Sequence, residues 1–268
     1  MIEPGVVYSP LEIRRIRQVA ELLSGIFRSL SKDIWLERSS MEIDKYVNRE
    51  MSRLGLQPAM FGYRGFPASC CISPNATAVH GIPDERKIGR GDIFTLDIAA
   101  KKNGWMTDCA WTYVAPGASE RAQRTVHAAW AVTRAVIAAV KPGRSIFELA
   151  KIAEATARDH CAHIIPQFAG HGIGRSLHEP PQLPFVTNGI AGDTSIVLRE
   201  GNVVSIEPVI TLGEPVVRPV GDGWGYRTAD ESPAAHFELI VHVHDTGARV
   251  LTFQGIPGTG LPEIPEFC

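Results

Sequence analysis

The sequence predicts an α/β protein made of two similar halves, each with two helices followed by strands and loops. Helix-start signals recur along the chain, and Ala118 follows Ser9 by 109 residues while Glu148 follows Glu42 by 106. We therefore predict one domain spanning 1–268, with pseudo-equivalent halves at about 9–117 and 118–253 and an irregular, proline-rich tail at 254–268. This organisation favours one sheet shared by both halves, with a functional site between them.

Two capping boxes begin the helices of the first half. Ser9-Pro10-Leu11-Glu12 combines an N-cap, a proline at the first helical position and a returning glutamate, and it predicts a helix to about Leu30. Ser39-Ser40-Met41-Glu42 repeats the box and begins a second helix that Gly55 ends. Strands and loops are expected from there to Ala115.

A predicted hairpin between Gly91 and Ala110 carries two aspartates. Apolar residues alternate along its first strand and place Asp97 on the opposite face. A two-residue turn at Asn103-Gly104 puts Asp108 opposite Ala99, whereas a turn one residue earlier pairs Asp97 with Asp108 directly. Both turns leave the carboxylates on one face within reach of one ion, but a three-residue loop would turn one away. An isolated pair of this kind is more often two solvated acids, so the rest of the chain decides.

The second half repeats the helical pattern before a region of strands. A long helix is predicted from Ala118 to Val140, and Lys141-Pro142-Gly143 ends it. Ser145-Ile146-Phe147-Glu148 is a third capping box and begins another helix.

The composition excludes several classes of protein. The 268 residues are 44% hydrophobic and 21% charged, as in ordinary globular proteins, and a net charge of −2 without a basic cluster argues against nucleic-acid binding. We find neither an exported leader nor a long apolar run, and expect no membrane association. Five cysteines, including Cys70-Cys71 and Cys268, form no disulfide framework, so we expect a reducing cytoplasm.

Three stretches of the second half add groups that the hairpin lacks. Gly170-His171-Gly172-Ile173-Gly174 places an imidazole between glycines, where we expect the backbone to approach an ion closely. Glu207 and Glu238 each oppose an apolar face in a strand-like segment. Carboxylates inside a sheet are costly without compensation, and cations would offset that cost. Four carboxylates and one imidazole suit a pair of bridged divalent ions, which predicts a dinuclear hydrolase.

The ordered set Asp97, Asp108, His171, Glu207 and Glu238 closely resembles that of the type I methionine aminopeptidases. Three motifs carry the resemblance over nearly the whole chain: Val79-His80-Gly81-Ile82-Pro83-Asp84, Gly170-His171-Gly172-Ile173-Gly174 and Ile206-Glu207-Pro208. The resemblance implies the pita-bread fold, in which pseudo-twofold halves with flanking helices surround a strongly curved antiparallel sheet. It also implies removal of the initiator methionine from nascent chains.

By position, the resemblance implies a role for each matching residue. The five residues named above would bind two divalent metals, and we expect Mn, Fe or Co in preference to Zn because oxygen donors dominate. Glu207 would also accept the proton of the attacking water, His80 would lie near the leaving nitrogen, and His178 would hold the substrate backbone or the tetrahedral intermediate. The methionine pocket would comprise Met60, Tyr63, Phe66, Cys71, Val79, Leu177 and Trp224. Without the resemblance, the same apolar residues would be interpreted as ordinary core, and each histidine as a brace for its loop.

Departures from the family pattern keep several interpretations open. Val79 replaces a cysteine that is usual in the family, Leu177 replaces an aromatic residue and Phe66 replaces a tyrosine. Near the metals, small hydroxyl residues are replaced by Ala99, Cys109 and Ala110, and a common histidine is replaced by Leu239. Such changes alter the groups that orient the ligands, which favours a paralogue with a changed rate, a narrowed substrate or resistance to an inhibitor.

Two further alternatives are a proline-specific peptidase of the same superfamily and a non-catalytic pita-bread binding protein. The short chain, without an extra N-terminal domain, and the apolar pocket argue against the first. Retention of all five ligands argues against the second. We expect a cytoplasmic monomer that acts on nascent N-termini, including those at the ribosome, with a small second residue preferred.

Overall fold

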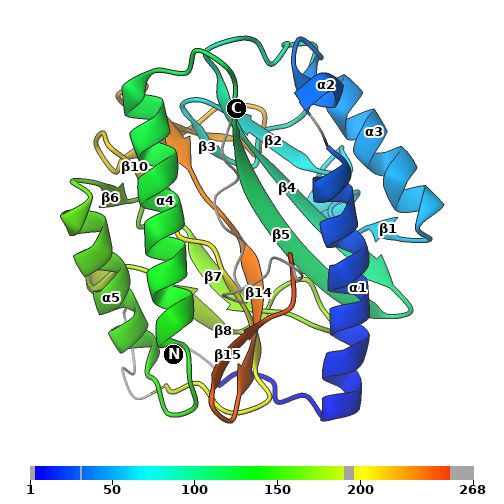
Figure 1. Cartoon of the computed structure of the whole chain (residues 1–268), viewed down its shortest axis with the longest axis vertical. Coiled ribbons are helices and arrows are strands. Elements are labelled where there is room, and N and C mark those ends of the chain that lie inside the picture. The colour runs from blue at the N-terminus through cyan, green and yellow to red at the C-terminus, as the bar shows by residue number, and fades with distance from the viewer. Residues whose placement is uncertain (1–3, 31, 190–195, 254–268) are drawn as a thin grey trace.

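A computed structural model describes residues 4–30, 32–189 and 196–253 (Figure 1). The predicted tail at 254–268, including Cys268, lies outside the described residues. Among the described residues, Cys70, Cys71, Cys109 and Cys161 are free thiols, as expected for a chain without a disulfide framework. No helix in the described part is long and apolar enough to cross a bilayer.

The helices begin where their capping boxes predict. Ser9, Ser39 and Ser145 each accept a hydrogen bond from the backbone three residues later, and the glutamate at that position closes the box. The long helix of the second half begins at Glu120, two residues later than predicted, because Ser119 is its N-cap. The α-helices among the described residues are α1 (Pro10–Ser29), α2 (Lys32–Trp35), α3 (Ser40–Arg53), α4 (Glu120–Ala139) and α5 (Ile146–Asp159).

The first half contributes a four-stranded antiparallel sheet. The long strand β4 lies at its centre and pairs with three neighbours. The strands of this sheet are β1 (Gln57–Pro58), β2 (Cys71–Pro74), β4 (Ile93–Lys102) and β5 (Trp105–Val114). Between them lie the short 3₁₀ turn η1 (Tyr63–Gly65) and strand β3 (Thr77–Val79).

The second half contributes a five-stranded antiparallel sheet in the order β15-β14-β9-β7-β8. Its strands are β7 (Ala169–Gly172), β8 (Glu179–Pro184), β9 (Val203–Ile206), β14 (Leu239–His244) and β15 (Gly247–Val250). Two three-stranded sheets, β13-β10-β6 and β11-β12-β3, complete the described strands. They comprise β6 (His163–Ile164), β10 (Ile210–Thr211), β11 (Val217–Pro219), β12 (Tyr226–Thr228) and β13 (Ala234–Ala235), and a second 3₁₀ turn, η2, covers Thr187–Gly189.

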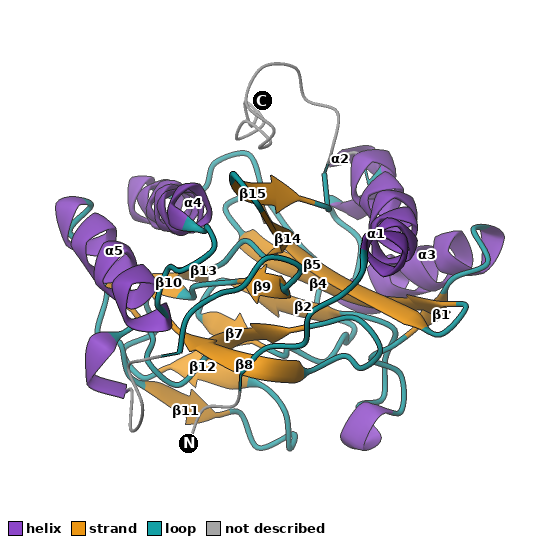
Figure 2. Cartoon of the chain, turned by 90° about the horizontal axis from the view of Figure 1, so that it is seen from below, coloured by secondary structure: helices purple, strands orange, loops and turns teal. Residues whose placement is uncertain are grey.

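The helices cover one side of the strands in two pairs, α1 with α3 and α4 with α5 (Figure 2). Between α1 and α4, the strands β4, β5 and β14 run through the centre of the molecule (Figure 1). One hydrophobic cluster extends from Tyr8 to Phe253 and so includes residues of both halves. This arrangement is the predicted pita-bread fold, although the limits of the two halves, 9–117 and 118–253, stay a prediction.

Candidate metal centre

The hairpin forms with the Asn103-Gly104 turn, one of the two that the sequence allowed. Lys102 pairs with Trp105, and both turn residues have positive φ values, 52° and 77°. This geometry matches the right-handed twist of the strands, and it suits asparagine and glycine. Asp108 therefore lies opposite Ala99, one position along the face from Asp97. The two carboxylates therefore share one face of the hairpin, as they must to bind the same ion.

The two halves join directly beside Asp108. The backbone N–H of Ala110 donates to the carbonyl of Glu238, and the N–H of Glu238 donates to the carbonyl of Ala110, at 3.2 and 3.0 Å. This isolated bridge holds β5 against the residue that precedes β14. The Oγ of Ser205 then donates to Oε1 of Glu238 at 2.5 Å and fixes that carboxyl group. The bridge thus brings a carboxylate of the second half to the hairpin of the first.

His171 lies on β7 with one ring nitrogen committed to the backbone. Its Nδ1 lies 2.9 Å from the carbonyl oxygen of Gly172, which can only accept, so the neutral ring carries its proton there. Burial lowers the pKa of His171 to about 3, so the ring is neutral at physiological pH. Its Nε2 lone pair then faces the carboxyls of Glu207 and Glu238, 3.3 and 3.9 Å away.

The glycines around His171 let β7 pack closely against its neighbours. A Cβ on Gly170 would lie 2.3 Å from the carbonyl oxygen of Ser205, and one on Gly172 would lie 2.1 Å from that of Pro180. This close packing against the backbones on either side positions the imidazole. The expectation that these glycines also let the backbone approach an ion stays a prediction.

Three carboxyl groups, those of Asp108, Glu207 and Glu238, lie near this imidazole, and the charge of the buried Asp97 acts on them. Ligand atoms of Asp108, His171 and Glu238 all lie within 4.8 Å of one another. Burial raises the pKa of Asp97 to about 7, and burial together with the charge of Asp97 raises the pKa of Glu207 to about 8. Burial and then the neighbouring carboxylates also raise the pKa values of Asp108 and Glu238.

Cations fit this arrangement. Asp97 Oδ1, Asp108 Oδ1 and Glu207 Oε1 are buried, and no described residue gives them a hydrogen bond. Buried acceptors without partners are costly, and so is keeping several neighbouring carboxyl groups charged in a buried site. A divalent ion among these atoms would remove both costs, and oxygen donors with one imidazole are ligands that such ions accept.

Two further histidines lie near the cluster. The ring of His178 lies 4.3 Å from that of His171, centroid to centroid, and its Nδ1 is 2.9 Å from the hydroxyl of Tyr63. His80 has a positive φ of 57° and lies between the rings of Phe168 and Trp224, 6.2 and 6.3 Å away. Burial lowers the pKa values of both His80 and His178. Neutral imidazoles here can donate or accept hydrogen bonds at neutral pH.

The residues of the predicted methionine pocket are found in two clusters. Cys71 pairs with Asp97 across β2 and β4, and its Sγ lies 3.8 Å from the Sδ of Met60. Phe66 packs its ring edge against Trp224 at 5.1 Å. These residues, with Tyr63 and Leu177, belong to the main hydrophobic cluster, whereas Val79 belongs to a smaller one with Ala78 and Ile165. Their contact with substrate stays a prediction.

Three residues close to the centre were not anticipated. Ser205 could have been found, because it lies two positions before Glu207 in an alternating strand. Phe168 contacts His80. His236 is buried, its Nδ1 has no hydrogen-bond partner in the part of the chain that the structure describes, and burial lowers its pKa to about 3. Neither has a local pattern that marks it, because each reaches the site only through long-range strand pairing.

The fold and this centre define a class of protein, and a family model agrees. Residues 14–245 match metallopeptidase family M24, so the chain belongs to that family. It is 31% identical to methionine aminopeptidase 1 of Bacillus subtilis over 244 residues, which cover 91% of this chain and 97% of that one. The crystal structure of methionine aminopeptidase from Thermotoga maritima matches with a TM-score of 0.87 and 31% identity, over 94% of this chain and 99% of that one. Prolidase from Pyrococcus furiosus shares the fold, with a TM-score of 0.73 and 22% identity over 94% of this chain and 66% of that one.

Proposed function

We propose that this chain is a metal-dependent aminopeptidase that releases N-terminal methionine from proteins and peptides. The observation that carries the proposal is the meeting of four buried carboxyl groups and a neutral imidazole where the halves join. Similarity to methionine aminopeptidases over nine-tenths of the chain supports the substrate class. We include the whole described chain in one catalytic domain, because residues from Asp97 to Glu238 contribute to the same centre.

Two divalent ions would be held by Asp97, Asp108, His171, Glu207 and Glu238. Four of these five side chains are oxygen donors, which favours Mn, Fe or Co over Zn. Bound there, the ions would act as Lewis acids that make water more acidic and polarise the scissile carbonyl.

The protein's own groups would handle the protons and the substrate. Glu207, whose Oε1 has no hydrogen-bond partner among the described residues, would accept a proton from the attacking water. His80 would contact the leaving nitrogen. His178, held through Nδ1 by Tyr63, would present its Nε2 to the substrate carbonyl. Each assignment leaves the five ligands free for the metals.

Specificity would depend on the size of two substrate residues. An unbranched thioether would suit the apolar surroundings of Met60 and Cys71, and the bulky Trp224 that packs on Phe66 would restrict the space for a second residue. We therefore expect methionine first and a small residue second. Nascent N-termini emerging in the cytoplasm, including those at the ribosome, would be the natural substrates of a monomeric enzyme.

Two other functions remain as alternatives. A paralogue with a narrowed substrate or with inhibitor resistance is favoured by the replacements Ala99, Cys109, Ala110 and Leu239, all of which are buried near the centre. A non-catalytic binding protein would have no use for four buried carboxyl groups that face one imidazole. The similarity to prolidase shows only a shared fold, so it does not favour proline specificity.

The proposal is tested with three peptides and protein reconstituted with Mn²⁺. Met-Ala-Ser should be hydrolysed, whereas Ala-Pro-Ala and Lys-Ala-Ser should be turned over at least about a hundredfold more slowly, since an apolar pocket rejects a charge. Dialysis against a chelator should abolish the activity, and Mn²⁺ should restore it. Faster cleavage of Ala-Pro-Ala would identify a proline-specific enzyme, and no cleavage of any peptide by fully metallated protein would favour the binding protein.

A further inference from the structure

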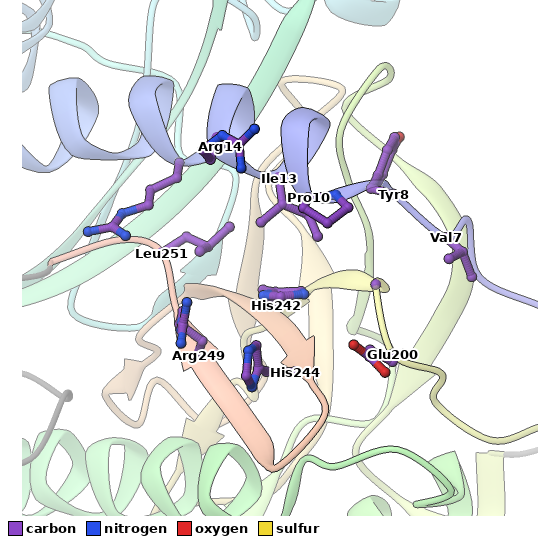
Figure 3. A pocket seen from close by; sticks show the side chains of 12 residues that line it. Val7, Tyr8, Pro10, Ile13, Arg14, Glu200, His242, His244, Arg249 and Leu251 are labelled. Carbon is purple, nitrogen blue, oxygen red and sulfur yellow. The ribbon is translucent and has the colours of Figure 1, made fainter.

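A surface hollow, which contains none of the proposed metal ligands, lies between the N-terminal turn of α1 and the β14–β15 hairpin (Figure 3). Its volume is about 570 Å³, which is within the range of small-molecule sites. Pro10 and Ile13 of α1 border it, and Leu251 lies beside them. None of its lining residues belongs to the predicted metal ligands or to the methionine pocket, so the peptidase function does not account for it.

Three arginines surround one end of this hollow. Arg14 and Arg17 come from α1, and Arg249 comes from β15. Arg17 is paired with Glu21 at 2.8 Å, but neither Arg14 nor Arg249 has an acidic partner among residues 4–30, 32–189 and 196–253. The guanidinium groups of Arg14 and Arg249 therefore make this end of the hollow favourable for an anion.

A buried histidine lies beside the arginines. His242 is 7% exposed and pairs across the strands with Arg249. Its Nδ1 is buried without a hydrogen-bond partner among the described residues. Burial, and then the charges of the neighbouring His244 and Arg249, lower the pKa of His242 to about 4. An unpartnered ring nitrogen is costly at this depth, and an oxygen-rich ligand would satisfy it.

The other end of the hollow has the opposite charge. Glu200 lies on the far side of His244 from Arg249, next to Val7 (Figure 3). A carboxylate there would accept a hydrogen bond from an amino group, while the side chains of Ile13 and Leu251 offer apolar contact between the ends. The ligand should thus carry an anion at one end and a hydrogen-bond donor at the other.

We propose that this hollow binds a nucleoside monophosphate, with its phosphate between Arg14 and Arg249 and an amino group of its base toward Glu200. Arginine forms bidentate hydrogen bonds with phosphate oxygens, which an isolated surface lysine cannot do. The base would cover the apolar middle of the hollow. The proposal does not depend on the peptidase function, because the two sites share no residue.

Calorimetric titration of the metallated protein with AMP, inorganic phosphate and adenosine tests the proposal. AMP should bind saturably and at least about tenfold more tightly than phosphate or adenosine, because only AMP reaches both ends. Arg14→Gln and Arg249→Gln should each weaken AMP binding about tenfold, as expected when one charge-assisted hydrogen bond is lost. Glu200→Ala should weaken the binding of AMP but not that of phosphate.

Arg15→Gln is the matched control. Arg15 is the neighbour of Arg14 on α1 but borders a different hollow, beside Lys102 and Trp105, so its loss changes the net charge equally. It should leave AMP binding unchanged, and all four variants should still hydrolyse Met-Ala-Ser if the wild type does. Three results would overturn the proposal: no saturable AMP binding at millimolar concentration, equal weakening by Arg15→Gln and Arg14→Gln, or phosphate binding as tight as AMP binding.

Discussion

The two halves of the molecule supply the metal centre in different ways. In the first half, Asp97 and Asp108 lie on one hairpin, and a two-residue turn fixes their relation. In the second half, His171, Glu207 and Glu238 come from three separate segments, which meet only when β7, β9 and β14 pair. Local residues therefore position the first pair of proposed ligands, whereas long-range backbone contacts position the other three.

This difference predicts where the protein is easily disrupted. A substitution in the hairpin should change the free energy of unfolding through the Asn103-Gly104 turn. A change in the second half should move a ligand, because β7 can lie close to its neighbours only while Gly170 and Gly172 lack side chains. The predictions below separate the two cases.

The largest effect is expected at Glu207, a proposed ligand from the second half. Glu207→Gln keeps the shape of the side chain but removes its basicity, and loss of a general base typically costs about 10²–10⁴ in rate. The kcat for Met-Ala-Ser should fall by that factor when metal content is matched to the wild type. Glu214→Gln, at a glutamate outside the centre, is the control and should behave as wild type. A fully metallated Glu207→Gln protein with normal kcat would remove Glu207 from the chemistry.

The next effect concerns the histidines that the metals do not need. His80→Ala and His178→Ala should each lower kcat/KM by about 10², as is typical for lost transition-state donors, with metal content and melting temperature nearly unchanged. His163→Ala, on the exposed end of β6, provides the control. If a variant instead loses metal or stability in proportion to its activity, that histidine only braces its loop.

Two glycine substitutions compare the halves directly. Gly172→Ala places a Cβ 2.1 Å from the carbonyl oxygen of Pro180, so we expect it to cost about 3 kcal/mol or more and to reduce metal binding. Gly104→Ala meets only ordinary contacts, and its φ of 77° should cost about 1–2 kcal/mol without changing the metal content. Urea unfolding and metal analysis measure both quantities. Equal losses of metal in the two variants would contradict the distinction between the halves.

The smallest effect is a pH dependence of the metal-free protein. The pKa values of Asp97 and Glu207 are raised by folding to about 7 and about 8, so the folded state binds more protons than the unfolded chain. Their contribution to stability is full below about pH 4 and is lost as the pH rises through these values. Between about pH 6.5 and 8.5, above the ordinary pKa of histidine, the melting temperature of the metal-free protein should fall. Saturating Mn²⁺ should flatten this slope, and an identical slope with and without metal would contradict the assignment.

The same difference between local and long-range contacts explains how much of this structure the sequence predicts. The three capping boxes depend on neighbours within four residues, and all were predicted. The Asn103-Gly104 turn is equally local and was one of the turns that the sequence left open. The start of α4 was misplaced by two residues, because Ser119 lacks the returning glutamate that completes a box.

The candidate site was predicted mainly through its resemblance to a family. The roles of Gly170 and Gly172 could not be inferred from neighbouring residues, because they depend on the carbonyls of Ser205 and Pro180 in other strands. The bridge between Ala110 and Glu238 spans more than a hundred residues and has no local pattern. Geometry of this kind becomes visible only when the strands are paired.

The most direct test of the account is the number of metal ions that the centre holds. Metal-free wild-type protein and Asp108→Asn are titrated with Mn²⁺ under identical conditions, and bound metal is counted per chain. Asp108 belongs to the hairpin and His171 and Glu238 to the second half, and their ligand atoms lie within 4.8 Å of one another, so we expect full occupancy to need all three. We predict two ions per wild-type chain and fewer than two, with weaker affinity, in Asp108→Asn. A wild-type chain that binds no Mn²⁺, or a variant that binds two ions with unchanged affinity, would contradict a dinuclear centre built from both halves.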